Sequence, residues 1–474
     1  MNFLKYISLF LLLSIHLFAN TQIEESIVKI YTVSKIPSYD TPWNSTIRRS
    51  SGSGAIIDGA MILTNAHVVA NQTFIEVKRH GDTNRYEAKI EYISHQADLA
   101  LLSVKDKNFF KGTNALSFGS LPNIQDKVAV YGFPMGGNSL SVSTGIVSRI
   151  EHTRYTHSGE IFLSIQIDAA VNPGSSGGPA ISDGKIVGVV MQQIQNSQNL
   201  GYLIPVDVVE HFLEDVKDKK YDGYPHVGMS TEMMENETLR SVYKMDKDTT
   251  GVLIIDMSEK FAARHQLQKG DVITAIDSHK IENDGTVEFR HHQFTSYKYY
   301  IDKKQLGEDV TFDILRDGKK MRVAVSLLNV ADDDLLVNTF AYDAMPKYFI
   351  YGGYVFTPLS RNLLVNTKSS LLRLREAAGE WVTKERDEAV VLLKVLASKA
   401  NRGDHNFSYW MVDKVNYKAF KNFEEFLEIV KNFDGKYLIL ENEDGVKIAI
   451  DTDEAKATQE ELLKRYSIKS AQKF

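Results

Sequence analysis

Ser176 is the residue whose surroundings most plainly predict chemistry. It lies in the run Gly174-Ser175-Ser176-Gly177-Gly178. Glycines on both sides allow a tight turn that exposes the hydroxyl and brings backbone N–H groups beside it. A hydroxyl that attacks a carbonyl needs a base to take its proton and donors for the developing oxyanion. Ser176 is therefore a candidate nucleophile for acyl transfer. Without further residues to support it, the glycine-rich run is better explained as a flexible turn between two strands.

Two polar residues upstream could supply the base and a carboxylate that orients it. His67 lies in Thr64-Asn65-Ala66-His67-Val68-Val69, and Asp98 leads directly into the apolar run that begins at Leu99. Each has a structural alternative, because His67 could be a core histidine and Asp98 a strand-end cap. Their order in the chain, His, Asp, Ser, is that of the chymotrypsin-type triad, whereas other triads use other orders. Together the three predict His67 as base, Asp98 as orienting carboxylate and Ser176 as nucleophile.

Backbone N–H groups of the same loop are the expected oxyanion donors. We expect Gly174 and Ser176 to donate, with the N–H of Ser175 also nearby. A donor of this kind typically contributes about 10²–10³ in rate. The geometry of the loop therefore matters as much as the triad.

Three blocks make the interpretation specific: TNAHVV, DLALL and QIDAAVNPGSSGGP. They resemble the catalytic blocks of the HtrA/Deg family of trypsin-like serine proteases. The resemblance implies a double β-barrel with the site between the barrels, His67 and Asp98 from the first and Ser176 from the second. The family usually has Asn where this chain has Ser175. Ser176 directly precedes the glycine pair and is assigned the attack, while Asp168 is expected to be structural.

The same resemblance implies the walls of the primary specificity pocket. None of the implied residues carries a charge, so a small-to-medium apolar residue is expected before the scissile bond. Each of them could equally be barrel core. The pocket residues are Val171, Val190, Met191, Gln192, Leu200 and Tyr202.

Composition bounds the remaining possibilities. The 474 residues suggest two to four domains, and 43% hydrophobic with 24% charged residues is ordinary for a globular protein. The net charge of −6 gives no reason to expect a nucleic-acid partner. The chain has no Cys, which excludes disulfides, a thiol nucleophile and a cysteine metal site. We expect no metal and no organic cofactor.

The first residues predict export. Lys5 precedes an apolar run from Ile7 to Phe18, and Leu17-Phe18-Ala19 offers a cleavage site. Residues 1–19 are therefore interpreted as a signal peptide, which places the mature protein in a bacterial periplasm and off the membrane. An uncleaved membrane anchor is the alternative, because the position three before the cut is Leu.

Many short strands separated by turns follow, as in an all-β fold. We expect a mainly β chain: a chymotrypsin-like double barrel at residues 20–217, then two α+β PDZ-like domains at 224–330 and 346–465. A helix from Val206 to Lys217, a linker from Asp218 to Pro225 and a helical insert from Ser360 to Glu388 are predicted.

The run Gly270-Asp271-Val272-Ile273 after a turn resembles the PDZ signature of HtrA proteases. PDZ domains bind peptide termini by adding a strand to a sheet edge. The implied carboxylate loops contain Val227, Gly228 and Met229 in the first domain and Tyr354, Val355 and Phe356 in the second. The first loop departs from the usual aromatic-glycine pattern, so this domain could instead pack on the protease and gate it. The layout is most similar to a plant branch of Deg proteases.

Two functions follow. The first is an ATP-independent endopeptidase that degrades misfolded periplasmic proteins, assembled as a homo-trimer or a multiple of a trimer, as is usual in the family. The second is a chaperone or scaffold that binds unfolded chains or peptide C-termini while catalysis is idle. Tyr31 and Trp43 are candidate aromatic contacts for the trimer. An intact triad favours the protease.

Overall fold

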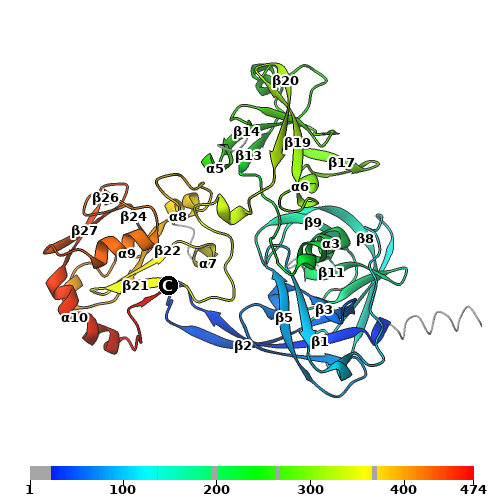
Figure 1. The fold of residues 1–474 in the computed structure, drawn as a ribbon, viewed down its shortest axis with the longest axis horizontal. Coiled ribbons are helices and arrows are strands. Elements are labelled where there is room, and N and C mark those ends of the chain that lie inside the picture. Colours follow the sequence, from blue (N-terminus) through cyan, green and yellow to red (C-terminus); the bar gives the residue numbers. More distant parts are fainter. Residues whose placement is uncertain (1–22, 136, 194–199, 263–265, 366–370) are drawn as a thin grey trace, which may run out of the picture. The chain divides into compact units, whose positions relative to one another are not determined.

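The computed structural model describes residues 23–135, 137–193, 200–262, 266–365 and 371–474 (Figure 1). The chain folds as two compact units. The first comprises the described residues up to Lys35, 47–225 and 274–312, and the second comprises 36–46, 226–273 and 313–474. This division runs through the first of the two PDZ-like regions expected from the sequence.

Two closed six-stranded barrels dominate the first unit, in the orders β1-β2-β3-β6-β5-β4 and β10-β11-β12-β9-β8-β7. A short helix α2 (Ala66–Val69) follows β3, and α3 (Val206–Asp215) follows β12, close to the predicted bounds. The strands of the first barrel are β1 (Ile27–Pro37), β2 (Ser45–Ile57), β3 (Met61–Thr64), β4 (Gln72–Arg79), β5 (Tyr86–Ser94) and β6 (Leu99–Val104). Those of the second are β7 (Lys127–Gly132), β8 (Ser141–Arg154), β9 (Ile161–Ile167), β10 (Pro179–Ser182), β11 (Lys185–Gln193) and β12 (Gly201–Pro205).

Strand β6 shows why the sequence folds this way. Successive side chains of a strand point to opposite faces. Leu99 and Leu101 therefore join the large core that includes the second barrel, whereas Ala100 and Leu102 fill the core of the first barrel. Both faces of β6 are buried, which explains why the run is continuously apolar.

Residues 218–225 are packed against the barrels and are not the predicted linker. Tyr224 is 2% exposed and its hydroxyl donates to the carbonyl of Val208 at 2.7 Å. The hydroxyls of Tyr221 and Ser94 share a 2.6 Å hydrogen bond. Charged and glycine residues around the two tyrosines suggested a linker, but buried aromatic rings dominate the packing.

The first unit also holds β17 (Thr286–Arg290), β18 (Gln293–Ser296) and α6 (Tyr299–Asp302) against the second barrel. His152 of β8 bonds to Thr295 Oγ1 at 2.7 Å and to Asp302 Oδ2 at 3.1 Å. Arg290 donates to the carbonyls of Leu121 and Pro122 at 2.6 and 2.7 Å. This segment agrees with the alternative in which the domain packs on the protease.

The sheet that follows the barrels has the order β13-β14-β15-β19-β20, with β16 beside β15. Strand β13 lies at the end of this order and is an edge strand. The division between the two units falls between residues 273 and 274 and between 312 and 313. The elements are β13 (Met229–Met233), α4 (Glu237–Val242), β14 (Val252–Met257), α5 (Glu259–Ala262), β15 (Val272–Ile276), β16 (His279–Lys280), β19 (Asp309–Arg316) and β20 (Lys319–Ser326).

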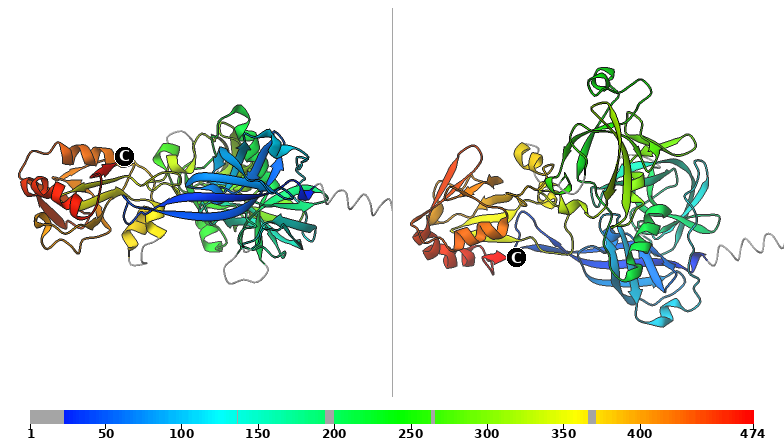
Figure 2. Two further views of the ribbon diagram at one scale, coloured as in Figure 1. Left: turned by 90° about the horizontal axis from the view of Figure 1, so that it is seen from below. Right: turned by 45° about the horizontal axis from the view of Figure 1, so that its top comes forward.

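The last domain, within the second unit, has two sheets, β24-β23-β22-β21-β29 and β26-β25-β27-β28. In both views of Figure 2 the orange and red helices, α9 and α10, pack against its strands. Its strands are β21 (Tyr348–Tyr351), β22 (Tyr354–Pro358), β23 (Val390–Val395), β24 (Trp410–Val412), β25 (Lys414–Val415), β26 (Lys418–Ala419), β27 (Tyr437–Glu441), β28 (Lys447–Asp451) and β29 (Gln472–Lys473). Its helices are α7 (Arg361–Val365) and α8 (Leu372–Ala377) in the predicted insert, α9 (Phe423–Lys431) and α10 (Thr452–Arg465).

The connection between β1 and β2 belongs to the second unit. Asp40 bonds to Lys394 Nζ at 2.8 Å and to the Tyr409 hydroxyl at 3.0 Å. Trp43 packs edge-on against Tyr348, with ring centroids 5.9 Å apart. Trp43 therefore has a partner within the chain that no local sequence pattern predicts.

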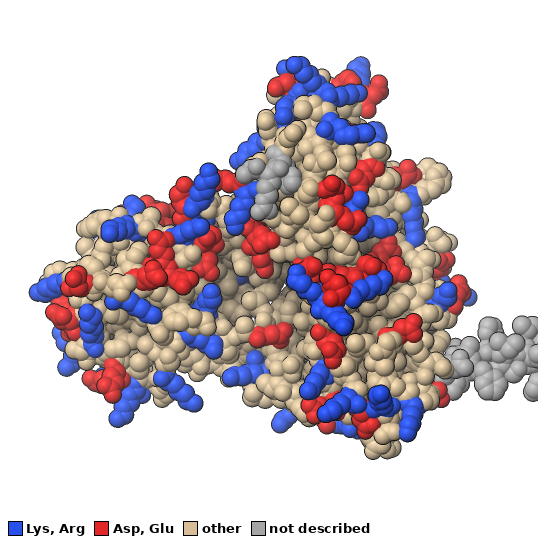
Figure 3. Space-filling model, in the orientation of Figure 1, with Lys and Arg blue, Asp and Glu red and all other residues tan. Residues whose placement is uncertain are grey.

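The mainly β architecture with two barrels is confirmed. In the described part of the chain no helix is long and apolar enough to cross a membrane. Residues 1–19, the predicted signal peptide, lie outside the described residues. Figure 3 shows basic side chains mixed with acidic ones over the face in view.

Candidate active site

His67 and Asp98 are brought together by two turns of the first barrel. His67 lies in α2, directly after β3, and Asp98 lies one residue before β6. The Nδ1 atom of His67 is 2.7 Å from Asp98 Oδ2, and the His67 backbone N–H donates to Asp98 Oδ1 at 2.8 Å. Asn65 Nδ2 donates to the Asp98 carbonyl at 2.9 Å. A carboxylate only accepts hydrogen bonds, so Nδ1 carries the proton and Nε2 can act as a base.

His67 and Asp98 shift each other's pKa in opposite directions. Burial alone would raise the pKa of Asp98, but the charge and hydrogen bonds of His67 outweigh it and lower the pKa. For His67, burial alone would lower the pKa, but the charge and hydrogen bond of Asp98 raise it above its usual value. Asp98 has a φ of 55°, in the left-handed region that few non-glycine residues adopt. Such backbone strain clusters at functional sites.

Ser176 lies on the loop between β9 and β10, against the turn that carries His67. The backbone N–H of Ser53 donates to the Ser176 carbonyl at 2.8 Å. A Cβ atom on Gly177 would lie 2.2 Å from both the Ser53 carbonyl oxygen and Thr64 Oγ1. Only glycine permits this approach, which seats the second barrel's loop on the first barrel. Among the described residues, the Ser176 hydroxyl has the Met191 carbonyl as its hydrogen-bond partner, at 3.2 Å, and not His67.

The loop's carbonyls are anchored, and this orients its N–H groups. Met135 N–H donates to the Pro173 carbonyl at 2.7 Å, and Gly178 N–H donates to the Ser175 carbonyl at 3.0 Å. In a planar trans peptide the N–H points opposite to the C=O. The N–H groups of Gly174 and Ser176 therefore point away from these anchors. Both directions are compatible with oxyanion donors.

Ser175 does not fit the expected role in the oxyanion hole. Its N–H donates to the Asn172 carbonyl at 2.9 Å, while Ser53 Oγ holds the carbonyl of the same peptide, that of Gly174, at 2.7 Å. The prediction for Ser175 is wrong, because a turn inside the loop uses this donor. Ser175 is also only 7% exposed, whereas Ser176 is partly exposed.

The structure adds neighbours that sequence reasoning missed. Ser53 Oγ accepts from the Phe133 N–H at 2.8 Å and donates to the Gly174 carbonyl. It therefore links the segment after β7 to the loop that carries Ser176. His157 bonds to His95 with 3.0 Å between Nε2 and Nδ1, and its ring lies 6.2 Å from that of His67. The small residues of Ser51-Gly52-Ser53-Gly54 were a possible signal for Ser53. His157 lies in an ordinary turn with no such signal.

The expected pocket residues lie mainly in the barrel core. Val171, Val190, Met191 and Tyr202 are all 5% exposed or less and belong to the large core cluster. Leu200 is half-buried, and the side chain of Gln192 lies outside what the structure describes. Asp168 accepts from Ile146 N–H at 2.6 Å, which is a structural role.

In the first PDZ-like domain, Val227, Gly228 and Met229 lead into the edge strand β13. Ser258 N–H donates to the Gly228 carbonyl at 2.7 Å, and Met229 N–H donates to the Val227 carbonyl at 2.7 Å. The Met229 donor is therefore engaged within the loop itself.

In the second PDZ-like domain the predicted peptide-binding residues Tyr354, Val355 and Phe356 are wrong. They form β22, which is paired with β21 on one side and β23 on the other. All three side chains are fully buried. Gly352 and Gly353 form the β21–β22 hairpin turn, with φ of 57° and 95°. A hairpin turn of this kind favours glycine.

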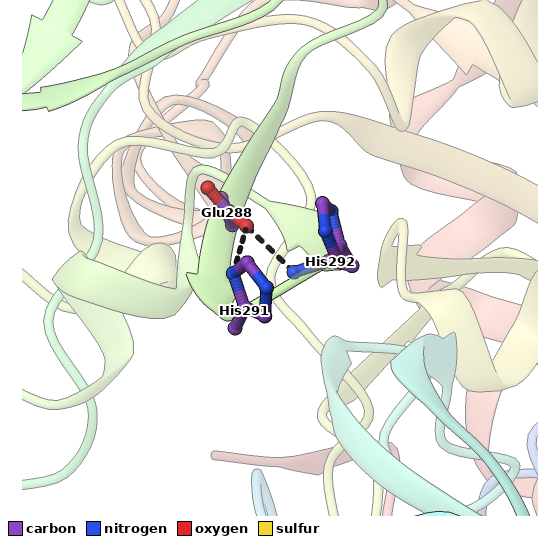
Figure 4. A group of neighbouring side chains, drawn as sticks. All are labelled: Glu288, His291 and His292. Atoms are coloured by element: carbon purple, nitrogen blue, oxygen red, sulfur yellow. Dashed lines mark hydrogen bonds and ion pairs between the residues drawn. The ribbon is translucent and has the colours of Figure 1, made fainter.

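One group of possible metal ligands lies outside this site. Glu288, His291 and His292 at the β17–β18 turn have ligand atoms within 4.8 Å of one another (Figure 4). All three side chains are exposed, and one Glu288 oxygen accepts the backbone N–H of His292 at 2.6 Å. The cluster takes no part in the chemistry of Ser176.

Comparisons with known proteins agree with this arrangement. Residues 52–189 match the trypsin-like peptidase domain family, and residues 225–327 and 337–473 match PDZ domain families. The chain is 37% identical to protease Do-like 4, mitochondrial, of Arabidopsis thaliana, over 95% of this chain and 85% of that protein. It is also 37% identical to protease Do-like 2, chloroplastic, of the same plant, over 94% and 74%.

Among solved structures, HtrA-type protease AlgW with decapeptide superposes with a TM-score of 0.51 at 22% identity, covering 65% of this chain and 97% of that one. This likeness shows the fold. The plant relatives, which align over nearly the whole chain, show the family. The chain is therefore a serine endopeptidase of the HtrA/Deg (protease Do-like) family, in which a trypsin-like peptidase domain precedes two PDZ domains.

Proposed function

We propose that this chain is an ATP-independent endopeptidase that degrades misfolded or damaged proteins through an acyl-enzyme. The observation that supports this chemistry is that two hydrogen bonds join His67 and Asp98. His67 Nδ1 lies 2.7 Å from Asp98 Oδ2, and the His67 backbone N–H donates to Asp98 Oδ1 at 2.8 Å. The loop that bears Ser176 lies against the same turn. We assign His67 as base, Asp98 as its orienting group and Ser176 as nucleophile.

The reaction begins when the Ser176 hydroxyl turns from the Met191 carbonyl toward His67 Nε2. His67 takes the proton as Ser176 Oγ bonds to the peptide carbonyl, and the N–H groups of Gly174 and Ser176 stabilise the oxyanion. The C–N bond then breaks as His67 returns the proton to the leaving amine. Water repeats the sequence on the acyl-enzyme. No metal or organic cofactor enters any step.

Specificity for a small-to-medium apolar residue before the scissile bond follows from the uncharged residues proposed for the pocket. Leu200, the proposed pocket residue whose described side chain is only half-buried, offers no partner for a charged side chain. Cleavage of a randomised peptide library should favour such residues. A profile dominated by Lys or Arg would contradict this part of the proposal.

Unfolded chains are the proposed substrates because they are extended and accessible. Strand β13 is an edge strand and could accept an extended segment. The same observation favours binding without cleavage as a second activity. A Ser176→Ala variant that suppresses aggregation of an unfolded client would support that activity, and one that does not would exclude it.

Location and assembly are proposed from the sequence alone. Residues 1–19 direct export to the periplasm and are removed after Ala19. N-terminal sequencing of the exported protein should begin at Asn20, and an intact Met1 would indicate an anchor instead. A homo-trimer or a multiple of it should appear in light scattering after size-exclusion chromatography, whereas a monomer would contradict that assembly.

The test of the proposed function is cleavage of unfolded casein by three proteins: the mature chain, Ser176→Ala and Ser175→Ala. The adjacent hydroxyl is the matched control, because Ser175 is buried and its N–H is used inside the loop. Loss of cleavage by about 10⁴-fold or more is expected for Ser176→Ala. Ser175→Ala should retain most of its activity. Equal loss in both variants would contradict the assignment.

A further inference from the structure

The turn between β17 and β18 carries three side chains of the kinds that bind metal ions. Glu288 lies in β17, and His291 and His292 form the two-residue turn between the paired residues Arg290 and Gln293. In Figure 4 dashed lines run from one Glu288 carboxylate oxygen to His291 and to His292. One ligand atom from each of the three lies within 4.8 Å of the others, which no other group of such residues in the described part of the chain achieves.

The turn places the two imidazole rings side by side. The ring centroids of His291 and His292 are 3.9 Å apart, whereas neighbouring side chains of an extended strand point to opposite faces. His292 has a φ of 57°, in the left-handed region that hairpin turns usually fill with glycine or asparagine. Glycine at this position would avoid the backbone strain, but it would also remove one of the two imidazoles.

The backbone of the turn orients the Glu288 carboxylate. Its Oε1 atom accepts the His292 N–H at 2.6 Å and lies 3.9 Å from His291 Nδ1. An ionised carboxylate has two oxygens with about four acceptor positions, so this hydrogen bond leaves room for a metal ion. Hydrogen bonds of this kind hold the ligands of metal sites in place. Ligand atoms around a tetrahedral zinc ion lie about 3.3 Å apart, and rotation of these exposed side chains covers the difference.

The three donors favour zinc over the common hard cations. Ca²⁺ and Mg²⁺ prefer sites built from oxygen ligands. Zn²⁺ takes imidazole nitrogen together with carboxylate oxygen, and two histidines with one glutamate leave the fourth tetrahedral position for water. The chain has no Cys, so no thiolate of its own competes for the ion.

The same hairpin is attached to the second barrel. Arg290, directly before the turn, donates to the carbonyls of Leu121 and Pro122 at 2.6 and 2.7 Å. Thr295 of β18 bonds to His152 of β8 at 2.7 Å. An ion that binds all three side chains of the turn binds only while the turn is folded, and it therefore stabilises the hairpin that makes these contacts.

We propose that Glu288, His291 and His292 form a zinc-binding site that holds the β17–β18 hairpin folded against the second barrel. The zinc ion is structural and takes no part in acyl transfer at Ser176. The site goes beyond the proteolysis proposed above, and zinc binding there does not depend on whether Ser176 is active.

Calorimetric titration of the metal-stripped Ser176→Ala protein with ZnCl₂ tests the site without self-cleavage. Adding His291→Ala or Glu288→Gln should weaken zinc binding at least about tenfold, because loss of even an outer contact of a metal site costs about 10–100-fold. His80→Ala is the matched control and should leave zinc affinity unchanged. His80 Nε2 also lies 3.9 Å from a carboxylate, that of Glu24, but the described residues give this pair no third ligand. Equal zinc affinity in all these proteins, or no zinc binding to Ser176→Ala, would overturn the proposal.

His292→Gly separates the loss of a ligand from damage to the fold. Glycine adopts a φ of 57° without strain, so the melting temperature in zinc-free buffer should stay the same or rise. Zinc affinity should nevertheless fall at least about tenfold. A His292→Gly protein that binds zinc as tightly as its parent would show that His292 is not a ligand and would overturn the proposed site.

Hydrogen exchange measures the effect of zinc on the hairpin. At a zinc concentration about 100 times Kd, opening of residues 286–296 should be suppressed about 100-fold in the Ser176→Ala protein, because only the folded turn binds the ion. The same zinc concentration should leave exchange unchanged once His291→Ala is added. Unchanged exchange in the zinc-bound Ser176→Ala protein would contradict the role of the ion in holding the hairpin.

Discussion

The two barrels contribute to the active site in different ways. In the first barrel, His67 and Asp98 bond directly to each other, so their geometry is set within two adjacent turns. In the second barrel, the loop of Ser176 is held by contacts that reach outside it, including Ser53 from the first barrel. The base is therefore locally determined, whereas the nucleophile and oxyanion donors depend on how the barrels meet.

This difference separates two kinds of variant. Substitutions in the His67–Asp98 pair should change proton transfer without moving the loop. Substitutions at the loop's anchors should change oxyanion stabilisation without changing the titration of His67.

The largest effect is expected for Asp98→Asn. An amide can place an N–H where Asp98 Oδ2 now accepts from His67 Nδ1, which would favour the wrong imidazole tautomer. We expect kcat to fall by about 10⁴-fold at neutral pH with little loss of structure. Asp168→Asn is the matched control, because this exposed carboxylate accepts the Ile146 N–H and has no hydrogen bond to His67 or Ser176 among the described residues, and it should change kcat little. An Asp98→Asn enzyme with a kcat within tenfold of wild type would show that Asp98 does not set the tautomer of His67.

Gly174→Ala tests the loop. Its φ is 98°, and a Cβ atom would lie 2.6 Å from the Phe133 carbonyl oxygen. The loop must shift, so the oxyanion donors should move and kcat should fall by about 10²–10³-fold. Gly184→Ala has a similar φ of 75° but no atom within 4 Å, and should cost stability without this loss of kcat. Steady-state kinetics and thermal melting of both variants measure the difference.

Ser53→Ala removes the hydroxyl that links the barrels. The Phe133 N–H and the Gly174 carbonyl would lose a partner in a buried position. We expect a loss of about 1–3 kcal/mol in the free energy of unfolding, and a fall of kcat of about tenfold as the loop gains freedom. Denaturant titration and kinetics check both. Ser164→Ala, a buried hydroxyl on β9 outside the loop, should affect stability alone. An unchanged kcat in Ser53→Ala would show that the Ser53 hydroxyl does not hold the oxyanion loop in place.

The smallest effect concerns pH. Burial of His67 alone would lower its pKa, but Asp98 raises it above 6.5. The base must be neutral, so kcat/KM should fall as the pH drops through this raised pKa. In Asp98→Asn the midpoint should move to lower pH, whereas Ser53→Ala should leave it in place. A wild-type pH profile of kcat/KM with its midpoint below pH 6.5 would contradict a His67 pKa raised by Asp98.

The sequence predicted the barrels and the short-range features of the site. Short apolar runs specify strands such as β6, and the order of His67, Asp98 and Ser176 limits the possible triads. The positions of His67 and Asp98 follow from turns at strand ends. The glycines around Ser176 were predicted to bring oxyanion donors close, whereas the structure shows that Gly177 is needed for the close approach to Ser53 and Thr64.

Features set by distant contacts could not be predicted from one sequence. The Ser175 N–H donates to the Asn172 carbonyl because the whole loop folds into a turn. Tyr354 to Phe356 are a central strand because β21 and β23 lie on both sides. Asp40 meets Lys394, more than 350 residues later in the chain. Local patterns carry no information about such partners.

Covalent labelling with a fluorophosphonate tests whether His67, Ser176 and the oxyanion donors act together as one catalytic site. The reagent transfers its phosphonyl group to an activated serine hydroxyl and releases fluoride, so it requires the base, the nucleophile and the oxyanion donors together. We expect a single adduct that mass spectrometry places on Ser176, and no adduct in His67→Ala. An adduct on Ser175, or a folded wild-type protein that stays unlabelled, would contradict it.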